Sequence, residues 1–309
     1  MWPDFDSLYR ELCPTLERLE DYRRELRAQG SRWGLLAGAL CLLAGVLTAC
    51  SVVEMWQLVM AIAAVVAVAA WYFCVASRGG RLNAAYKEQV IGAMVSRLCE
   101  GAEYRPDEGI SQRQFEDSGL FSTRPDRYRS EDRISGRIDR TDFVCSEIVA
   151  EERQVTVDSK GRRHEQWVDI FRGFFFIADF QKDFQGRTVV CRNSWFRWPS
   201  SRRVKLENPA FEKRFDTYST DQVEARYLLT PGMMERLLAL DDRFPGKITL
   251  SFVDSRIVVA IPDAKDHFET GIWRNQLDSG ILSREYEVLT ALLGIVNDLQ
   301  LNCRIWTKQ

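Results

Sequence analysis

Residues 143–177 read FVCSEIVAEERQVTVDSKGRRHEQWVDIFRGFFFI. Apolar residues recur at every second position on both sides of a polar turn at residues 158–161, for example Val155 and Val157 before the turn. A period of two is typical of strands, and two such runs around a short turn predict a β-hairpin. We therefore expect an antiparallel sheet in this part of the chain.

The elements that follow extend this sheet and cover it. Strand-like runs are predicted at residues 188–192, 204–206, 214–218, 247–252 and 256–261. One helix is predicted from Pro231 to about Leu240, with Thr230 as its cap, and a second from Ser283 to near Asn302. Strands in series with a C-terminal packing helix indicate an α+β antiparallel-sheet domain. A pleckstrin-like barrel has the same order of elements and is one form this domain could take.

Two apolar runs precede the sheet region, Trp33–Val53 and Met55–Ala76, with Glu54 between them. Each run is about the ~20 residues that a helix needs to cross a hydrocarbon core. We therefore expect a transmembrane helical hairpin. Basic residues flank both outer ends and none lies in the turn, which predicts a multi-pass protein with both termini cytoplasmic. A lipoprotein cleavage site at Leu47–Cys50 is a weaker alternative, because a signal peptide has only a short basic leader.

The predicted organisation has four parts. Residues 1–32 form an N-terminal amphipathic cytoplasmic helix, 33–77 the hairpin, 78–125 a juxtamembrane helix and linker, and 126–309 the cytoplasmic α+β domain. Pro14 is expected to interrupt the first helix early. That helix either binds a partner, as in a coiled coil, or packs on the protein's own soluble part.

Composition excludes several classes of protein. With 28% charged residues and a net charge of −2, the chain lacks the basic excess of a nucleic-acid-binding protein. Its eight cysteines are scattered without a C-x-x-C motif, which indicates reduced, buried thiols and no metal site. His164 and His267 lie in polar stretches, and His164 is expected on the surface. No catalytic motif is recognisable, so no cofactor or metal is predicted.

One cationic and aromatic segment is a candidate surface for binding an anionic membrane. Its residues are Arg192, Trp195, Phe196, Arg197, Trp198, Arg202, Arg203 and Lys205. Each cation near an anionic leaflet contributes ~1 kcal/mol, and the rings can enter the headgroup layer. The alternative is that Trp195 and Phe196 end a strand in the core while the arginines are ordinary surface residues.

Two longer runs resemble the signatures of a known family. The first lies within residues 168–190 and contains FRGFF (171–175) and DFQKDFQGRT (179–188); the second is FDTYSTDQVEARYLLTP (215–231). Together they are similar to bacterial two-span membrane proteins known only as a domain of unknown function. The resemblance implies a bacterial inner-membrane protein and brings no activity, cofactor or catalytic residue.

The second signature contains a possible ligand-binding cluster of Asp221, Glu224 and Arg226. An acid–Arg pair can bind a carboxylate or phosphate, although such clusters are more often structural ion pairs. The leading hypothesis is a membrane-anchored, non-enzymatic interaction or scaffold protein whose cytoplasmic domain binds an unidentified partner protein or the lipid surface. The alternative is a membrane-face enzyme acting on a lipid or small molecule through these three residues.

Overall fold

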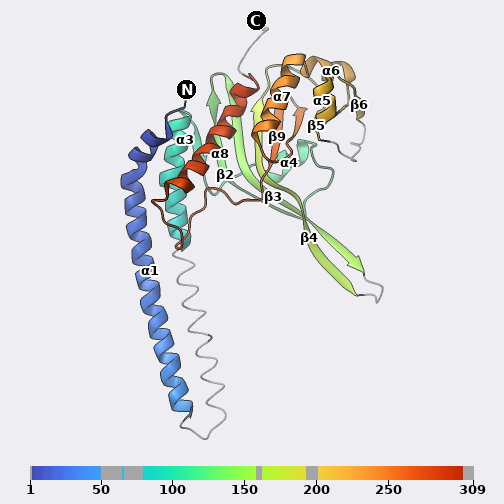
Figure 1. The fold of residues 1–309 in the computed structure, drawn as a ribbon. Helices are drawn as coiled ribbons and strands as arrows, with labels where there is room; N and C mark the ends of the chain where they lie inside the picture. The colour runs from blue at the N-terminus through green and yellow to red at the C-terminus, as the bar shows by residue number, and fades with distance from the viewer. Residues whose placement is uncertain (1, 50–64, 66–78, 158–161, 193–200, 302–309) are drawn as a thin grey trace. The chain divides into compact units, whose positions relative to one another are not determined.

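A computed structural model describes residues 2–49, 65, 79–157, 162–192 and 201–301 (Figure 1). The chain divides into two compact units. The sheet unit comprises Met1–Pro3, Gly92–His267 and Arg284–Gln309, and the helical unit comprises Asp4–Ile91 and Phe268–Ser283. The chain therefore leaves the sheet unit after His267 and returns to it at Arg284.

The sheet unit is built on a nine-stranded sheet in which every pairing between described strands is antiparallel. The strands are β1 (Glu103–Arg105), β2 (Arg127–Ile138), β3 (Thr141–Val157), β4 (Arg163–Asp179), β5 (Thr188–Cys191), β6 (Arg202–Val204), β7 (Asp216–Ser219), β8 (Thr249–Val253) and β9 (Arg256–Pro262). Their spatial order is β1-β2-β3-β4-β9-β8-β5-β7-β6. Since β1 and β6 each pair on one side only, the described strands form an open sheet and not the closed barrel suggested by the order of elements.

The predicted hairpin is confirmed as β3 and β4. The two strands pair from Phe143↔Ala178 to Val157↔Arg163, with one irregularity between Ala150 and Glu151. The later strands, β5 to β9, begin and end within two residues of their predicted positions. Alternation of apolar residues is a local signal, and here it located the strands correctly.

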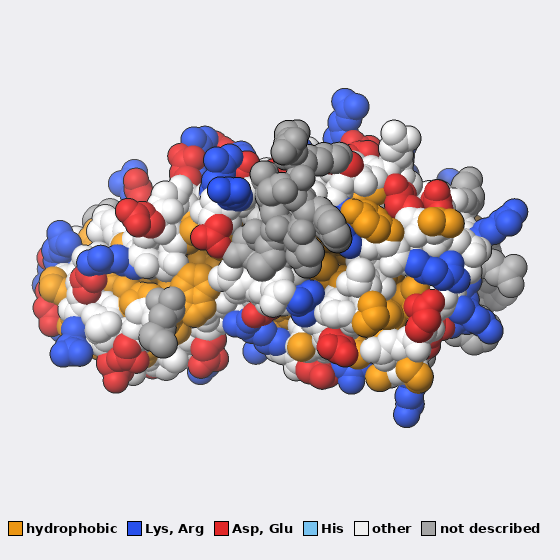
Figure 2. Space-filling model, turned by 90° about the horizontal axis from the view of Figure 1, so that it is seen from above, with side chains coloured by type: hydrophobic (Ala, Val, Ile, Leu, Met, Phe, Trp, Pro, Cys, Tyr) orange, Lys and Arg blue, Asp and Glu red, His pale blue; other side chains and the backbone are white. Residues whose placement is uncertain are grey.

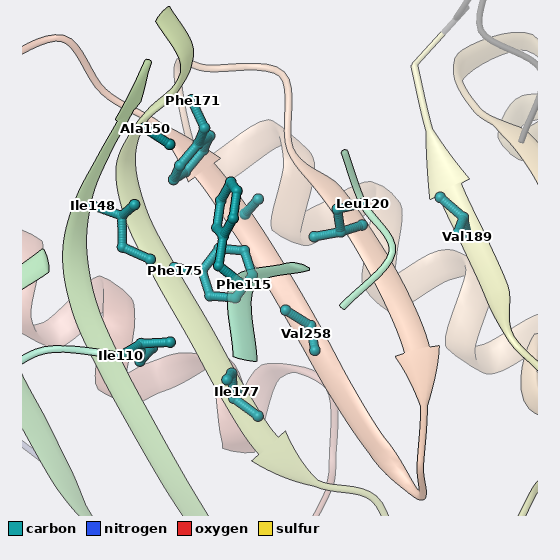
Figure 3. Packing of buried hydrophobic residues seen from close by; sticks show 11 residues of the cluster. Ile110, Phe115, Leu120, Ile148, Ala150, Phe171, Phe175, Ile177, Val189 and Val258 are labelled. Carbon is teal, nitrogen blue, oxygen red and sulfur yellow. The ribbon is translucent and has the colours of Figure 1, made fainter. Parts of the chain in front are cut away.

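A cluster of buried apolar residues packs helix α4 (Gln112–Asp117) against the sheet (Figure 3). Ser111 caps α4 through a complete capping box, which holds Phe115 in place. The ring of Phe115 lies 5.4 Å from that of Phe175 and 6.2 Å from that of Phe171, both on β4. Full burial of one such side chain contributes ~1.5–3 kcal/mol, so this cluster anchors the middle of the sheet.

Five further helices are α3 (Gly92–Leu98), α5 (Pro209–Arg214), α6 (Gln222–Leu228), α7 (Pro231–Arg243) and α8 (Ser279–Asp298). Thr230 caps α7 as predicted, with Pro231 in its first turn. The sequence did not predict α5, α6 or β2. Strand β2 begins just after the predicted linker and was missed because Ile134 is its one buried apolar residue and no alternation marks it.

The helical unit contains α1 (Phe5–Ala49), a helical segment at residues 79–86 and the π-helical turn η1 (Lys87–Ile91). Helix α1 runs through Pro14, so the predicted early interruption is wrong. The Glu20 carboxylate accepts hydrogen bonds from Arg23 (2.6 Å) and from the backbone N–H of Gln276 (3.1 Å). The hydrogen bond from Arg23 is the main reason that the pKa of Glu20 falls to about 2. This buried pair ties the 268–283 segment to α1.

The structure contradicts the predicted transmembrane hairpin. Among the residues that are described, none of the helices combines the length with the apolar character that crossing a membrane requires. Helix α1 is described from Phe5 to Ala49, and its apolar part begins at residue 33. Apart from Val65, the second predicted span lies outside the described residues, as does Cys50 of the lipoprotein alternative. The multi-pass inner-membrane localisation with cytoplasmic termini is therefore withdrawn with the hairpin.

Candidate functional site

The two signature runs meet in the sheet unit. The chain passes from β4 through residues 180–187 into β5, and from β7 through residues 220–221 into α6. The two carboxylate oxygens of Glu224 accept hydrogen bonds from the backbone N–H groups of Gln185 (2.8 Å) and Gly186 (2.7 Å). Residues 180–187 and 220–228 are together termed the signature junction.

Strand pairing explains why these segments lie together. Thr188 at the start of β5 pairs with Ser219 at the end of β7, so the two connecting segments leave the sheet at the same point. There Thr220 Oγ1 accepts a hydrogen bond from the Arg187 N–H (2.9 Å), and the Thr220 N–H donates to the Arg187 carbonyl (3.0 Å). The junction is thus bonded through both backbone and side chains.

Helix α6 is fixed at its start and along its inner face. Asp221 Oδ1 accepts hydrogen bonds from the N–H groups of Val223 (2.8 Å) and Glu224 (3.1 Å), which caps the helix. Ala225 and Leu228 are fully buried. These contacts hold the Glu224 carboxylate against the 185–186 backbone.

Gly186 leaves room for the close approach of this carboxylate. A Cβ atom at position 186 would lie 2.3 Å from Glu224 Oε2 and 3.0 Å from Thr220 Oγ1. Any larger residue would push Glu224 away from the loop. The glycine of the first signature and the glutamate of the second are therefore parts of one contact.

The outer face of α6 carries two exposed apolar side chains one turn apart. Val223 is 79% exposed and Tyr227 is 51% exposed. Lys182 donates a hydrogen bond to the Tyr227 carbonyl (2.6 Å), and its ammonium lies 4.2 Å from the centre of the Tyr227 ring. Partial burial lowers the pKa of Lys182. The tyrosine is thus held between its own helix and the first signature run.

Among the described residues on the face seen in Figure 2, no large area carries charge of a single sign. Cationic and anionic side chains are interspersed there, with smaller apolar areas between them. This mixture agrees with a net charge of −2. Exposed large apolar side chains are therefore more selective markers of a binding surface than charge.

The predicted cluster of Asp221, Glu224 and Arg226 lies on or beside α6, but its side chains point to separate tasks. Asp221 caps the helix, and Glu224 binds the 185–186 backbone. Arg226 donates to the carbonyls of Gln222 (3.1 Å) and Lys205 (3.2 Å) and lies 3.7 Å from Glu207. Each of these contacts stabilises local structure. Ligand binding by the cluster stays a prediction.

The predicted membrane-binding segment is only partly described. Trp195, Phe196, Arg197 and Trp198 lie outside the described residues. Arg192 forms an ion pair with the fully buried Asp241 carboxylate, which also contacts Arg214 at 3.5 Å.

The remaining cations of that segment differ in their contacts. Arg203 pairs with Asp216 (2.5 Å) and lies 3.8 Å from Glu212, whereas Arg202 and Lys205 are exposed. Two of its cations, Arg192 and Arg203, are thus engaged in ion pairs inside the sheet unit.

A buried charged cluster around His267 was not predicted. His267 Nε2 lies 3.0 Å from Asp263 Oδ2, Nδ1 lies 3.5 Å from Glu285 Oε2, and the backbone N–H lies 3.4 Å from Glu147 Oε2. Burial lowers the pKa of His267, but the hydrogen bonds and charges of Glu285 and Asp263 outweigh it and raise the pKa to about 9. Burial and the charge of Asp266 raise the pKa of Glu147 to about 8.

This His267 cluster joins elements far apart in the chain. It ties the residues after β9 to β3 and to α8, next to the points where the chain leaves and re-enters the sheet unit. The Asp263–His267 spacing of four was the only local signal, since Glu147 and Glu285 are distant in sequence. His164, by contrast, is exposed as expected.

The fold and the junction define a protein with an antiparallel α+β sheet unit. Residues 169–301 match the family described as "Protein of unknown function (DUF3137)". The resemblance predicted from the two signatures is thereby confirmed for this part of the chain, which contains both runs apart from residue 168; the two-span membrane character attributed to the family is not confirmed.

Comparison with curated proteins finds no match. Among solved structures, the crystal structure of the mycobacterial trehalose monomycolate transport factor A, TtfA, matches at 13% sequence identity and a TM-score of 0.37. The match covers 68% of this chain and 94% of that one. A likeness at this TM-score supports no conclusion about this chain.

Proposed function

We propose that this chain is a non-enzymatic interaction protein whose sheet unit binds a partner protein through the outer face of α6. The observation that carries the proposal is the exposed pair of Val223 and Tyr227. Side chains at i and i+4 of a helix lie on the same face, so the two form one apolar surface. Tyrosine is among the residues that most often dominate binding energy at protein interfaces.

The junction presents this surface in a fixed geometry. Glu224 binds the backbone at residues 185–186, Asp221 caps the helix, and Lys182 holds Tyr227 from the side. A surface that is already ordered loses less conformational entropy on binding. An exposed apolar pair on a preorganised element therefore supports a docking role better than the same pair on a loose loop.

The other hypotheses have less support from the described residues. Enzyme chemistry was assigned to Asp221, Glu224 and Arg226, all of which are used in local hydrogen bonds. Lipid binding was assigned to the segment at residues 192–205, where Arg192 and Arg203 form ion pairs. A partner that contributes apolar side chains to α6 requires neither set.

The test is affinity capture with the full chain and two variants. Val223→Asp combined with Tyr227→Asp places charge at the centre of the proposed surface. Tyr22→Asp makes the same kind of change at an exposed tyrosine on α1, away from both α6 and the β3–β4 hairpin in sequence, and serves as the matched control. We expect a partner that the wild type and the control retain and the double variant loses, with a direct affinity about 30-fold lower or more, since hot-spot residues contribute ~2 kcal/mol or more.

Two outcomes would contradict the proposal. Equal capture of the same proteins by the double variant would show that α6 is not the docking surface. Binding of phospholipid vesicles that only the double variant loses would assign the surface to lipid instead. Circular dichroism and thermal unfolding of each variant establish that the fold is intact before the comparison is made.

A further inference from the structure

The outer parts of β3 and β4 form a two-stranded ribbon that extends beyond the rest of the sheet (Figure 1). Pairing of β2 with β3 reaches only Arg127↔Glu151, and pairing of β9 with β4 begins only at Gly173↔Pro262. Residues 152–157 and 163–171 therefore pair with each other and with no third described strand. On β4, residues 163–171 thus have an edge that faces no other described strand, whereas on β3 the Arg153 N–H already donates to Asp126 (2.8 Å).

The ribbon is exposed on both faces. Residues 153–157 and 163–166 are all exposed, including Val155 (47%) and Val157 (62%). Within the ribbon Arg153 lies 3.9 Å from Glu165, and at its base Arg127 of β2 lies 3.5 Å from the centre of the Trp167 ring. An isolated two-stranded hairpin is at best marginally stable in water, so a further strand would stabilise it.

The charges at the two ends of the outer part of β4 are opposite in sign, so two antiparallel copies of this strand would be complementary. Arg163, Glu165, Trp167 and Asp169 alternate on one face of the strand, with the cation near the turn and the anion near the sheet. When two such strands run antiparallel about a twofold axis at Gln166, Arg163 of one faces Asp169 of the other, and this occurs twice. Opposite charges directly across an antiparallel pair are stabilising, and like charges are destabilising.

We propose that a second copy of this chain adds its β4 strand to the open edge of β4, antiparallel and centred on Gln166. The contact is isologous, with the same residues on both sides, as in most twofold dimers. Asp169 also lies 3.2 Å from Arg172 of its own strand, which orients the carboxylate. The ribbon is a self-association arm, separate from the α6 surface.

The test exchanges charges between two variants of the full chain. Arg163→Asp alone gives a copy with Asp at both facing positions, and Asp169→Arg alone gives a copy with Arg at both. Each variant should form homodimers at least about tenfold more weakly than the wild type, because two attractive pairs become two repulsive ones. An equimolar mixture should form heterodimers, since every facing pair is then Arg with Asp.

Sedimentation velocity over a concentration series measures these equilibria, with Val223→Asp as a control that should dimerise like the wild type. A wild type that is still monomeric at roughly 100 μM, about 100-fold above a micromolar dissociation constant, overturns the proposal. Equal dimerisation of the single variants, or a mixture that stays monomeric, overturns it as well. If the wild type stays monomeric, the charges of β4 serve instead to keep its open edge from pairing.

Discussion

Replacing His267 by Gln should destabilise the sheet unit at acidic and neutral pH and have little effect above pH 10. In the native protein the pKa of His267 is raised from 6.5 to about 9 by Glu285 and Asp263, which together outweigh the effect of burial. Because the folded pKa lies above the unfolded one, the stabilisation is fully present below pH 6.5 and is lost as pH rises through 9.

The magnitude follows from the size of the pKa difference. Each pKa unit corresponds to about 1.4 kcal/mol, so the rise from 6.5 to about 9 represents on the order of 3 kcal/mol. For a unit of this size, 1 kcal/mol shifts the melting temperature by roughly 2–4 °C. The variant should therefore melt about 6–12 °C lower than the wild type at pH 6, with the gap closing as the pH approaches 10.

Differential scanning fluorimetry and urea unfolding across pH 5–10 measure this gap. Gln has a side chain of similar length that can hydrogen-bond but cannot carry charge, so it separates the ionic contribution from packing. A gap of the same size at every pH would refute the argument, because it would show that His267 stabilises by packing alone. A His164→Gln variant, changed at the exposed histidine, should show no comparable gap.

Two further predictions concern buried contacts. Glu147→Gln should leave stability unchanged near pH 4 and raise it increasingly between pH 4.5 and 8, because the carboxyl, whose pKa burial raises to about 8, stays protonated in the folded protein while it ionises in the unfolded chain; urea unfolding at pH 4 and pH 8 checks this. Gly186→Ala should lower the free energy of unfolding by about 1–3 kcal/mol, because the new Cβ would collide with Glu224 Oε2. In a chain that already carries Glu224→Ala, the same change at position 186 should cost much less. A double-mutant cycle of unfolding free energies measures this difference.

Local patterns predicted local structure well. The alternation in residues 143–177 gave β3 and β4, and Thr230 with Pro231 gave the start of α7. Helix α6 had an equally local signal, because Asp221 followed three residues later by Glu224 is the spacing of a helix N-terminus. We interpreted the pair as part of a structural ion-pair cluster with ligand binding as the alternative, whereas Asp221 caps the helix and Glu224 binds the 185–186 backbone.

Non-local features could not be predicted from one sequence. The His267 cluster needs Glu147 and Glu285, which lie far from it along the chain and are brought together only by the fold. The membrane prediction failed for a different reason. Hydropathy scores apolar residues along the sequence, whereas none of the helices among the described residues is both long and apolar enough to cross a membrane.

The limits of the family match separate the two proposals. The signature junction lies entirely within residues 169–301, so the contact between Glu224 and the 185–186 backbone belongs to the part shared with the family. The β3 strand and Arg163 lie before that region, and only Asp169 of the proposed facing pair falls inside it. Partner binding through α6 is therefore expected of proteins that keep the junction. Self-association through β4 is expected only of proteins that have a cation at the position of Arg163 as well as an aspartate at that of Asp169. A relative without the cation should sediment as a monomer and still bind its partner through α6.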